Sequence, residues 1–80
     1  MPVILKKQPM KYLASVDIPT REKLYRALDQ VSRLEGDIQP LKGQNRMYRY
    51  KIAHYRILFT IDAERNIIVS TINTRTNVKY

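Results

Sequence analysis

Two alternating runs of apolar and polar residues between Met47 and Ile61 constrain the fold of this chain more than any other feature. If the chain turns at Ala53-His54, the alternation sets the register of an antiparallel hairpin, because side chains point to opposite faces with a period of two. The expected pairs, from the turn outward, are Ile52 with Tyr55, Lys51 with Arg56, Tyr50 with Ile57, Arg49 with Leu58 and Tyr48 with Phe59. One face of the hairpin is then apolar, and the other face carries cations.

The second face presents Arg49, Lys51 and Arg56, which we call the cationic group, with Lys51 directly opposite Arg56. Opposed like charges on a strand pair destabilise the sheet by up to about 1 kcal/mol. Such a group suits an anion, most simply a phosphate, because guanidinium groups bind phosphate oxygens through paired hydrogen bonds. The spacing fits equally well a solvated outer face whose long cations guard the sheet against edge pairing.

The length and charge of the chain limit the function classes. Eighty residues suffice for one domain, residues 1–80, with one core. The 15 Lys and Arg against 7 Asp and Glu give a net charge of +8, which predicts nucleic acid, an acidic protein or an anionic membrane as partner. The absence of cysteine excludes disulfides and a cysteine nucleophile, and fits a reducing compartment such as the cytoplasm. The apolar runs are too short to span a bilayer, and residues 1–11 do not look like a signal peptide.

The N-terminal half has the pattern of a short strand followed by two helices. Residues 3–5 are apolar and predict the strand, and apolar residues at helical spacing predict a helix over residues 9–15. A longer stripe of Leu, Ala and Val predicts a second helix over residues 21–35. The residues expected to bound these helices are Pro9 at the start of the first, Asp17 and Thr20 as cap candidates, and Gly36 as the left-handed end of the second.

A surface connection and three further strands are expected to follow. Residues 37–46 contain a proline and a glycine and predict the connection. The strands are predicted over residues 47–53, 55–62 and 67–73, and the last is apolar on both sides, which favours an interior position. The order predicts an α+β domain in which an N-terminal strand and a helical hairpin precede a three-stranded antiparallel meander, with the helices packed on one face of the sheet.

The chain offers few other chemical groups. A lone His and scattered carboxylates do not match the spacing of metal ligands, so we expect no metal and no cofactor. The serines have no triad context, and no glycine-rich phosphate loop is present. Arg75 follows the last strand, which runs back toward the start of the strand before it, so Arg75 can approach Arg56. Fixed guanidinium groups can stabilise charge on a phosphodiester while a Lys or a Tyr moves protons.

For several residues, the sequence allows both a structural and a functional role. The four aromatic residues of the hairpin favour core packing over base stacking, because they share its apolar face. His54 is either an ordinary turn residue or an acid/base, since histidine exchanges protons near neutral pH. Tyr80 closes the chain, and the default for a terminus is disorder.

Three segments of the chain resemble the RelE/ParE superfamily of bacterial and archaeal toxins. They are PLKG at residues 40–43, MYRYKIAHYRILFTID at 47–62 and TINTRTNVKY at 71–80. The shared pattern is a Leu-Lys-Gly loop, a Tyr-Arg-x-Lys strand, a Tyr-Arg pair that opens the next strand, and a late Arg followed by Tyr. The likeness extends to the order of strand, two helices and three strands. One departure is Ala53-His54, where relatives usually carry Gly or a polar turn.

In the RelE branch, the resemblance implies a toxin that enters the ribosomal decoding site and cleaves mRNA there without a metal. The 2′-hydroxyl of the RNA attacks the adjacent phosphate, which leaves a cyclic phosphate and a 5′-hydroxyl. The residues that correspond by position to catalytic residues are Lys51 for proton transfer or charge stabilisation, Arg56 for the scissile phosphate, Arg75 for the transition state, and Tyr80 for base stacking or general base catalysis. The residues expected to bind RNA are Lys42, Arg46, Arg49 and His54.

The resemblance also implies partners and alternatives. The expected partners are a cognate acidic antitoxin, the ribosome and mRNA, with no membrane. The ParE branch instead inhibits DNA gyrase and tends to lack this catalytic set. A third possibility, from a different class, is a non-catalytic basic module that binds nucleic acid or a protein partner.

Overall fold

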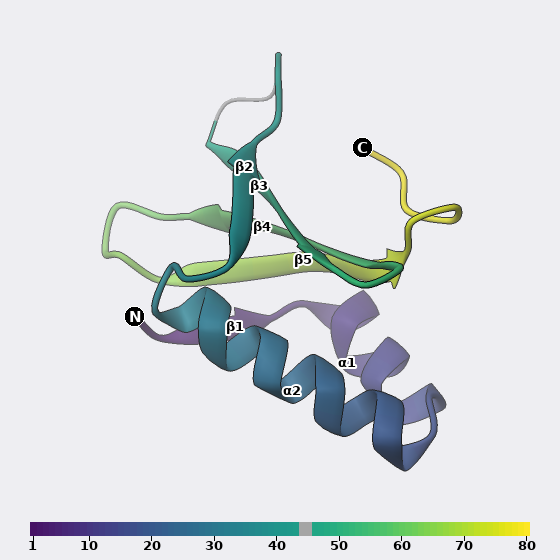
Figure 1. Ribbon diagram of the computed structural model, residues 1–80. Helices are drawn as coiled ribbons and strands as arrows, with labels where there is room; N and C mark the ends of the chain where they lie inside the picture. Colours follow the sequence, from purple (N-terminus) through teal and green to yellow (C-terminus); the bar gives the residue numbers. More distant parts are fainter. Residues whose placement is uncertain (44–45) are drawn as a thin grey trace.

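A computed structural model describes residues 1–43 and 46–80, in which two helices cover one face of a five-stranded sheet (Figure 1). The elements in chain order are β1 (Val3–Leu5), α1 (Lys7–Ser15), α2 (Ile18–Ser32), β2 (Asp37–Pro40), β3 (Met47–Ile52), β4 (Tyr55–Ile61) and β5 (Ile67–Thr74). The strand order across the sheet is β1-β5-β4-β3-β2. Neighbouring strands are antiparallel except β1, which runs parallel to β5. The predicted α+β class, with both helices on one face, is confirmed.

The hairpin of β3 and β4 has the predicted register. All five pairs expected from the turn outward are present, among them Lys51 opposite Arg56 and Tyr50 opposite Ile57. The turn falls at Ala53-His54, where Ala53 has a left-handed φ of 50°. The interior position of the last strand is also confirmed, because β5 lies between β1 and β4.

The prediction of a surface connection over residues 37–46 is wrong in its first part, because Asp37–Pro40 forms the edge strand β2. Pro40 is compatible with this strand for a geometric reason. The N–H of Leu41 donates to the carbonyl oxygen of Met47 at 2.9 Å, so the backbone of Pro40, one residue earlier, faces away from β3 and needs no donor. Gln44 and Asn45, which also belong to the predicted connection, lie outside the described residues.

The second helix ends earlier than predicted. The helix α2 stops at Ser32 instead of Glu35, and Leu34 takes the left-handed conformation with a φ of 53°. The N–H of Leu34 donates to Val31 O and that of Glu35 to Gln30 O, both at 2.9 Å, which is the Schellman pattern of a helix C-terminus. The prediction that Gly36 ends the helix is therefore wrong.

Glycine is required at position 36 for a different reason, because the ring of Tyr50 packs directly against Gly36. A Cβ atom at Gly36 would lie 2.5 Å from Cε2 of Tyr50, and the φ of Gly36 is 95°. The hydroxyl of Tyr50 donates to the side chain of Gln30, which ties β3 to α2. Burial raises the pKa of Tyr50, and the negative charge of Asp37 raises it further.

The second helix also begins earlier than predicted, at Ile18, and Asp17 is its N-cap instead of Thr20. The backbone N–H of Thr20 donates to Oδ1 of Asp17 at 3.1 Å. Hydrogen bonds from the side chain and backbone of Thr20 lower the pKa of Asp17 below its ordinary value of 3.8. The first helix starts two residues before the predicted Pro9, at Lys7.

The Asp17 cap predicts that stability falls in acid. A lowered carboxyl pKa means that the unfolded chain binds the proton more tightly, so the stabilisation is complete above about pH 4 and is lost as the pH falls through the lowered value. We expect the free energy of unfolding to decline less steeply with acid in Asp17→Asn than in the wild type, because Asn still caps the helix without titrating. Urea unfolding between about pH 2 and pH 7 measures this.

Glu22→Gln is the matched control for that measurement, because Glu22 is an exposed acid on the same helix. Its profile should follow the wild type. Some acid sensitivity should remain in Asp17→Asn, because hydrogen bonds from Asn66 also lower the pKa of Asp62. Identical profiles for Asp17→Asn and the wild type would contradict the assigned role of Asp17.

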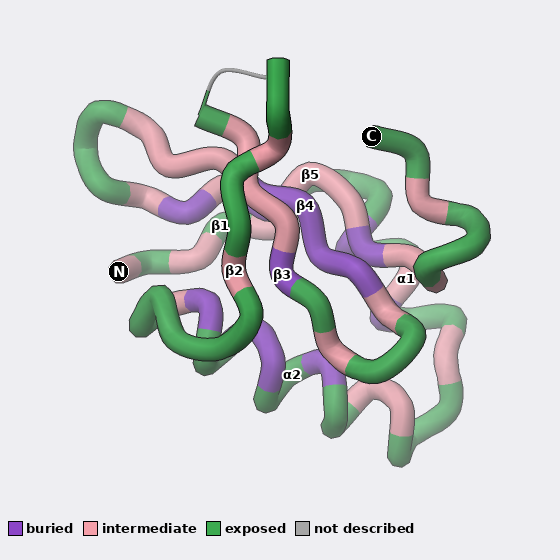
Figure 2. Tube along the Cα trace, turned by 45° about the horizontal axis from the view of Figure 1, so that its top comes forward, coloured by how far each residue is buried: buried purple, intermediate pink, exposed green. Residues whose placement is uncertain are grey.

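The core lies between the helices and the covered face of the sheet. Figure 2 shows buried residues along the middle of β4 and on the inward side of α2. The buried apolar residues of this core are Leu13, Leu24, Ala27, Leu28, Val31, Tyr50, Ile57, Phe59, Ile67, Val69 and Ile72. Phe59 is fully buried and stacks on Tyr48 with ring centroids 5.5 Å apart. The predicted core role of the hairpin aromatics is confirmed for this pair and for Tyr50.

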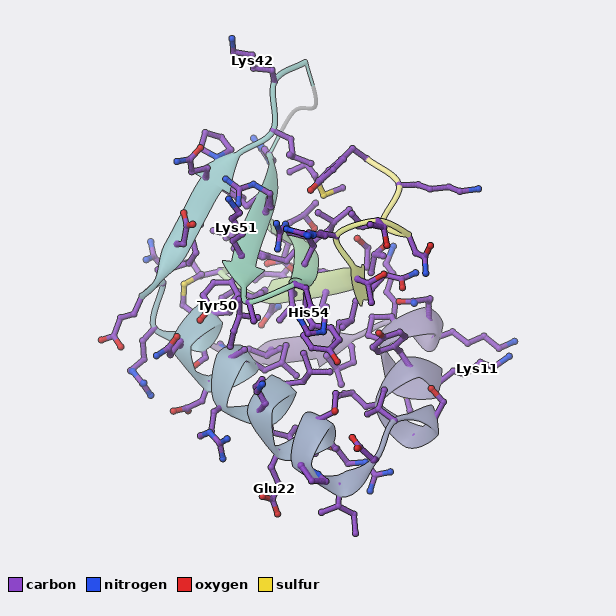
Figure 3. The ribbon with its side chains drawn as sticks, turned by 45° about the vertical axis from the view of Figure 1, so that its right-hand side comes forward. Lys11, Glu22, Lys42, Tyr50, Lys51 and His54 are labelled. Carbon is purple, nitrogen blue, oxygen red and sulfur yellow. The ribbon has the colours of Figure 1, made fainter. Side chains whose placement is uncertain are left out.

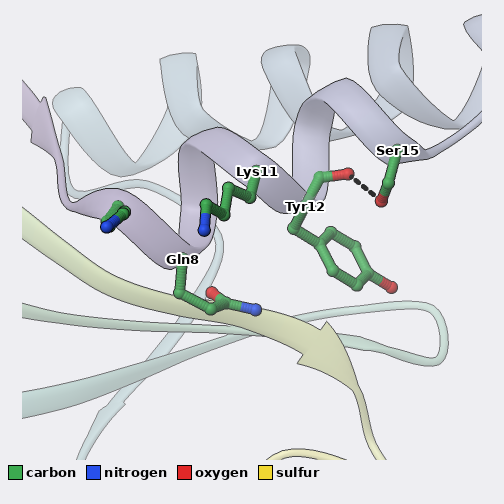
Figure 4. A pocket seen from close by; sticks show the side chains of 5 residues that line it. Gln8, Lys11, Tyr12 and Ser15 are labelled. Carbon is green, nitrogen blue, oxygen red and sulfur yellow. Dashed lines mark hydrogen bonds between the residues drawn. The ribbon is translucent and has the colours of Figure 1, made fainter.

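Two side chains fix the helices in place. Arg21 donates from Nε to Leu13 O at 2.7 Å and from Nη2 to Val16 O at 3.1 Å, so it joins the start of α2 to the end of α1. Gln8 reaches from α1 to β5, where its amide exchanges two hydrogen bonds of 2.8 and 2.9 Å with the backbone of Ile72 (Figure 4). The Gln8 amide thereby satisfies the backbone N–H and C=O of Ile72, which lies beyond the part of β5 that β1 pairs with.

Candidate nucleic-acid interface

The cationic group lies on the face of the sheet that points away from the helices. Arg49 and Lys51 alternate with the tyrosines of β3 that face the core, so they take the opposite face. On this side, the joined ends of β2 and β3 rise from one part of the sheet and the C-terminal tail rises from another (Figure 1). The group is therefore flanked by two projecting segments of the chain.

The members of the cationic group have different environments. Lys51 is exposed, whereas only 7% of Arg56 is exposed. Nη1 of Arg56 donates to the carbonyl oxygens of Ala53 at 3.0 Å and Tyr55 at 2.8 Å, so this side chain holds the β3–β4 turn. The interpretation of the group as a fully solvated face is wrong for Arg56. Leu58, which pairs with Arg49 on this face, is buried as well.

Arg49 carries an unusual donor. Its Nη1 atom is buried and has no hydrogen-bond partner within the described part of the chain. A buried guanidinium N–H without an acceptor is costly, by roughly 1–3 kcal/mol, unless an acceptor is supplied from outside. The fold therefore leaves this N–H without an acceptor at a position that is shielded from solvent.

Arg75 and His54 meet at the hairpin turn. The N–H of Arg75 donates to the carbonyl oxygen of His54 at 2.7 Å. Because Arg56 pairs with Asn73 and Tyr55 with Thr74, the backbone of Arg75 lies beyond the end of β5, beside the turn. The ring of His54 packs against that of Tyr55, with centroids 4.4 Å apart. The fold thus brings Lys51, His54, Arg56 and Arg75 to one end of the sheet.

Two of the predicted RNA-binding residues lie at the other end of the hairpin. Lys42 stands at the raised tip before β3, far from Lys51 and His54 (Figure 3), and Arg46 immediately precedes β3. Arg46 lies five residues before Lys51, which is about 17 Å along the strand at roughly 3.3 Å per residue, so the backbones of Lys42 and Arg46 are at the opposite end of the hairpin from Lys51. They remain predicted contacts to a more distant part of a long ligand.

The C-terminal tail carries Tyr80, and the tail is ordered at its base. The N–H groups of Asn77 and Val78 donate to the carbonyl oxygen of Thr74 at 3.1 and 2.9 Å. From this turn the tail rises on the face that carries the cationic group (Figure 1). Tyr80 is more than half exposed, so its ring is available to a ligand.

A comparison with protein families identifies the chain. The family described as ParE toxin of type II toxin–antitoxin system, parDE, matches residues 4–78. The chain belongs to this toxin family. The resemblance to the RelE/ParE superfamily that was drawn from the sequence is confirmed. A search of curated proteins gives no match to this toxin.

Solved structures of antitoxin–toxin complexes share the fold of this toxin. The RelB–RelE complex of Methanococcus jannaschii matches with a TM-score of 0.74 and 22% identity over 91% of each chain. The RelBE complex of E. coli matches with a TM-score of 0.73 and 17% identity, covering 91% of this chain and 94% of that one. The RelE–RelB complex of Pyrococcus horikoshii OT3 matches with a TM-score of 0.73 and 21% identity, covering 96% and 97%.

A cavity that lies beside α1 was not predicted from the sequence. A cavity of about 580 Å³ lies along α1, with Lys7, Lys11 and Ser15 on its wall (Figure 4). The spacing of these residues, four apart, is a signal that could have found it. Tyr12 also lines this cavity. Burial raises the pKa of Tyr12, and the electrostatic interaction with the nearby Tyr55 raises it further.

Residues 1–43 and 46–80 offer neither a metal site nor a membrane-spanning helix. In this part of the toxin, no three His, Asp or Glu side chains gather in a way that could hold a metal ion. No helix there is long and apolar enough to cross a membrane.

Proposed function

We propose that this toxin cleaves mRNA on the ribosome, with the reacting phosphate bound by the cationic group and Arg75. The observation that carries this proposal is the direct opposition of Lys51 and Arg56 beside the turn that Arg75 joins. Like charges held together in this way are unfavourable unless an anion binds between them. A phosphodiester is the anion that the family resemblance implies.

The proposed reaction uses the RNA as its own nucleophile. The 2′-hydroxyl loses its proton to a base and attacks the adjacent phosphorus, while the bond to the 5′-oxygen breaks and that oxygen receives a proton. The products are a 2′,3′-cyclic phosphate and a 5′-hydroxyl. Lys51 is exposed and can reach the RNA for proton transfer or charge stabilisation, and His54 and Tyr80 are the other proton-transfer candidates.

The arginines would stabilise the extra negative charge of the transition state. Nη1 of Arg56 is fixed by two carbonyl oxygens, so its remaining N–H groups are pre-oriented and lose little freedom on binding phosphate. Arg49, on the same face of the sheet, would add positive charge beside the bound phosphate. Arg75 would supply a further guanidinium from the end of β5.

The proposal includes partners. The solved structures that share this fold are complexes with antitoxins, and a net charge of +8 favours an acidic protein. We therefore propose that an acidic antitoxin neutralises this toxin in the cytoplasm and that the ribosome and mRNA are its targets. The projecting cations Lys42 and Arg46 would contact RNA away from the cleaved bond.

A second candidate function is inhibition of DNA gyrase. It is favoured by the description of the matching family, which is the ParE toxin. In this case the basic face would bind the acidic surface of a gyrase–DNA complex without cleaving a phosphodiester bond.

The two candidates are separated by one pair of assays. Purified toxin is incubated with ribosomes that hold a defined mRNA, and the 5′ ends of the products are mapped. We expect new 5′ ends within the decoding site and no accumulation of cleaved DNA bound to gyrase. Intact message together with gyrase trapped on DNA would replace the first proposal with the second. Salt-sensitive nucleic-acid binding without either effect would indicate a non-catalytic module.

A further inference from the structure

The proposed function does not use the cavity of about 580 Å³ beside α1. Space for this cavity exists because β1 pairs with β5 as far as Val69, whereas β5 continues beside α1 to Thr74. Small molecules typically occupy cavities of roughly 300–1,000 Å³. We call this site the α1 cavity, and its lining side chains all come from α1: Lys7, Gln8, Lys11, Tyr12 and Ser15 (Figure 4).

The α1 cavity is positively charged. Lys7 and Lys11 are exposed and lie four residues apart, so their side chains are neighbours on one face of the helix. The helix itself contains no acidic residue. The ion pairs within residues 1–43 and 46–80 both belong to Arg33, so no carboxylate there neutralises either lysine. Like charges at this spacing repel each other, and an anion bound between them would offset that repulsion.

Gln8 and Ser15 already form hydrogen bonds within the protein. The amide of Gln8 both donates to and accepts from the backbone of Ile72. The hydroxyl of Ser15 donates to the carbonyl oxygen of Tyr12 at 2.8 Å, so its oxygen can still accept a hydrogen bond from a ligand. Donation to a bound anion therefore falls to the lysines, whose ammonium groups each carry three N–H donors that suit phosphate oxygens.

Tyr12 provides a flat ring in the same cavity. Its side chain is half-buried, because it packs against the core and also lines the cavity. Burial raises the pKa of Tyr12, so its phenol stays protonated and adds no negative charge beside a bound anion. Tyrosine rings stack on nucleobases of any sequence, because every base has a π face. Lys7 and Tyr12 lie five residues apart, about 7.5 Å along the helix axis, which leaves room for a ribose between a phosphate and a base.

We propose that the α1 cavity binds a nucleotide, with its phosphate between Lys7 and Lys11 and its base against Tyr12. Ser15 would accept a hydrogen bond from the ribose or the base. A free mononucleotide and one nucleotide of a nucleic-acid chain both offer this chemistry. The assignment goes beyond the proposed function and does not depend on it, because no residue of the cavity belongs to the cationic group.

Calorimetric titration of the full-length toxin with AMP tests this site. We expect saturable binding that is tighter for AMP than for adenosine or inorganic phosphate, because each of these lacks one of the two contacts. Lys11→Ala and Tyr12→Leu should each weaken AMP binding by about 10-fold or more. Lys23→Ala and Tyr25→Leu are the matched controls and should bind AMP as the wild type does, because they make similar changes on α2, outside the α1 cavity. The melting temperature of each variant shows that it folds, and Lys11→Ala alters an exposed side chain that the core does not need.

A trinucleotide of 2′-deoxyribonucleotides distinguishes the two sources of the ligand. It lacks the 2′-hydroxyl, so the proposed reaction cannot cleave it during the titration. If Tyr12→Leu weakens trinucleotide binding at least as much as AMP binding, the α1 cavity binds a nucleotide within a chain. If Tyr12→Leu weakens AMP binding alone, the ligand is a free nucleotide. Both results support the assigned site.

Three results would overturn the assignment. If AMP does not bind the wild type, Lys7 and Lys11 are solvated cations. Equal affinity for AMP and inorganic phosphate would show an anion site without a base contact. A loss of AMP binding in Lys51→Ala but not in Lys11→Ala would place the nucleotide on the cationic group. None of these titrations uses ribosomes, so the assignment can fail while mRNA cleavage is observed, and it can hold while cleavage is absent.

Discussion

If the proposed function is right, we expect Lys51→Ala to lower the rate of mRNA cleavage on programmed ribosomes by about 100-fold or more and to leave the melting temperature nearly unchanged. The rate should fall because Lys51 is the exposed member of the opposed pair and would reach the phosphate or the 2′-hydroxyl in the proposed site. Stability is retained because removing Lys51 also relieves its repulsion by Arg56. The measurement is single-turnover cleavage of ribosome-bound message, with thermal unfolding of the same preparations.

A conservative variant distinguishes the two possible roles of Lys51, charge stabilisation and proton transfer. Lys51→Arg keeps the positive charge but cannot release a proton near neutral pH, so it rescues cleavage if Lys51 only stabilises charge and fails if Lys51 transfers a proton. Lys23→Ala is the matched control, because it removes the same side chain from an exposed position on α2. Wild-type cleavage by Lys51→Ala would remove Lys51 from the proposed site.

Truncating Phe59 to alanine should destabilise the toxin by about 3–5 kcal/mol, which is most of the stability expected of a small domain. Phe59 is fully buried at the centre of β4 and stacks on Tyr48, so its loss leaves a cavity between the sheet and the helices. The free energy of unfolding from urea titration measures the effect.

Met10→Ala is the control for Phe59→Ala. Met10 is exposed and alanine is a good helix former, so this truncation should change the free energy of unfolding by less than about 0.5 kcal/mol. An unchanged urea midpoint for Phe59→Ala would show that the centre of β4 is not the core of the fold.

The hairpin and the helices could be predicted from the sequence because their signals are local. The alternation of Tyr48, Tyr50 and Ile52 with cations specifies which side of β3 is buried, and a slip of one residue would bury the cations. The apolar stripe of α2 likewise specifies its inward face. The predicted ends of the helix were less accurate. The prediction chose Gly36 as the left-handed residue that ends the helix, whereas Leu34 has that role and Gly36, whose φ is also positive, lies two residues later.

The strand β2 could not be predicted in the same way. Its four residues include Pro40 and are too few for their alternation to stand out, and they become a strand because the edge of β3 offers hydrogen-bond partners. The position of β1 is a similar case, since a three-residue apolar run does not specify its neighbour or its direction. Both assignments depend on contacts between segments that are distant in the sequence.

The sequence by itself predicted the opposition of Lys51 and Arg56, because the period of two along each strand together with a turn at Ala53-His54 sets the pairing register. Only the tertiary structure decided what surrounds that pair. It buried Arg56 against the carbonyl oxygens of Ala53 and Tyr55, brought the backbone of Arg75 to His54, and left Lys42 at the far tip. It also formed the cavities that Leu5 and Tyr25 line. Burial, turn contacts and grooves arise where separate elements meet, and no periodicity within one element encodes them.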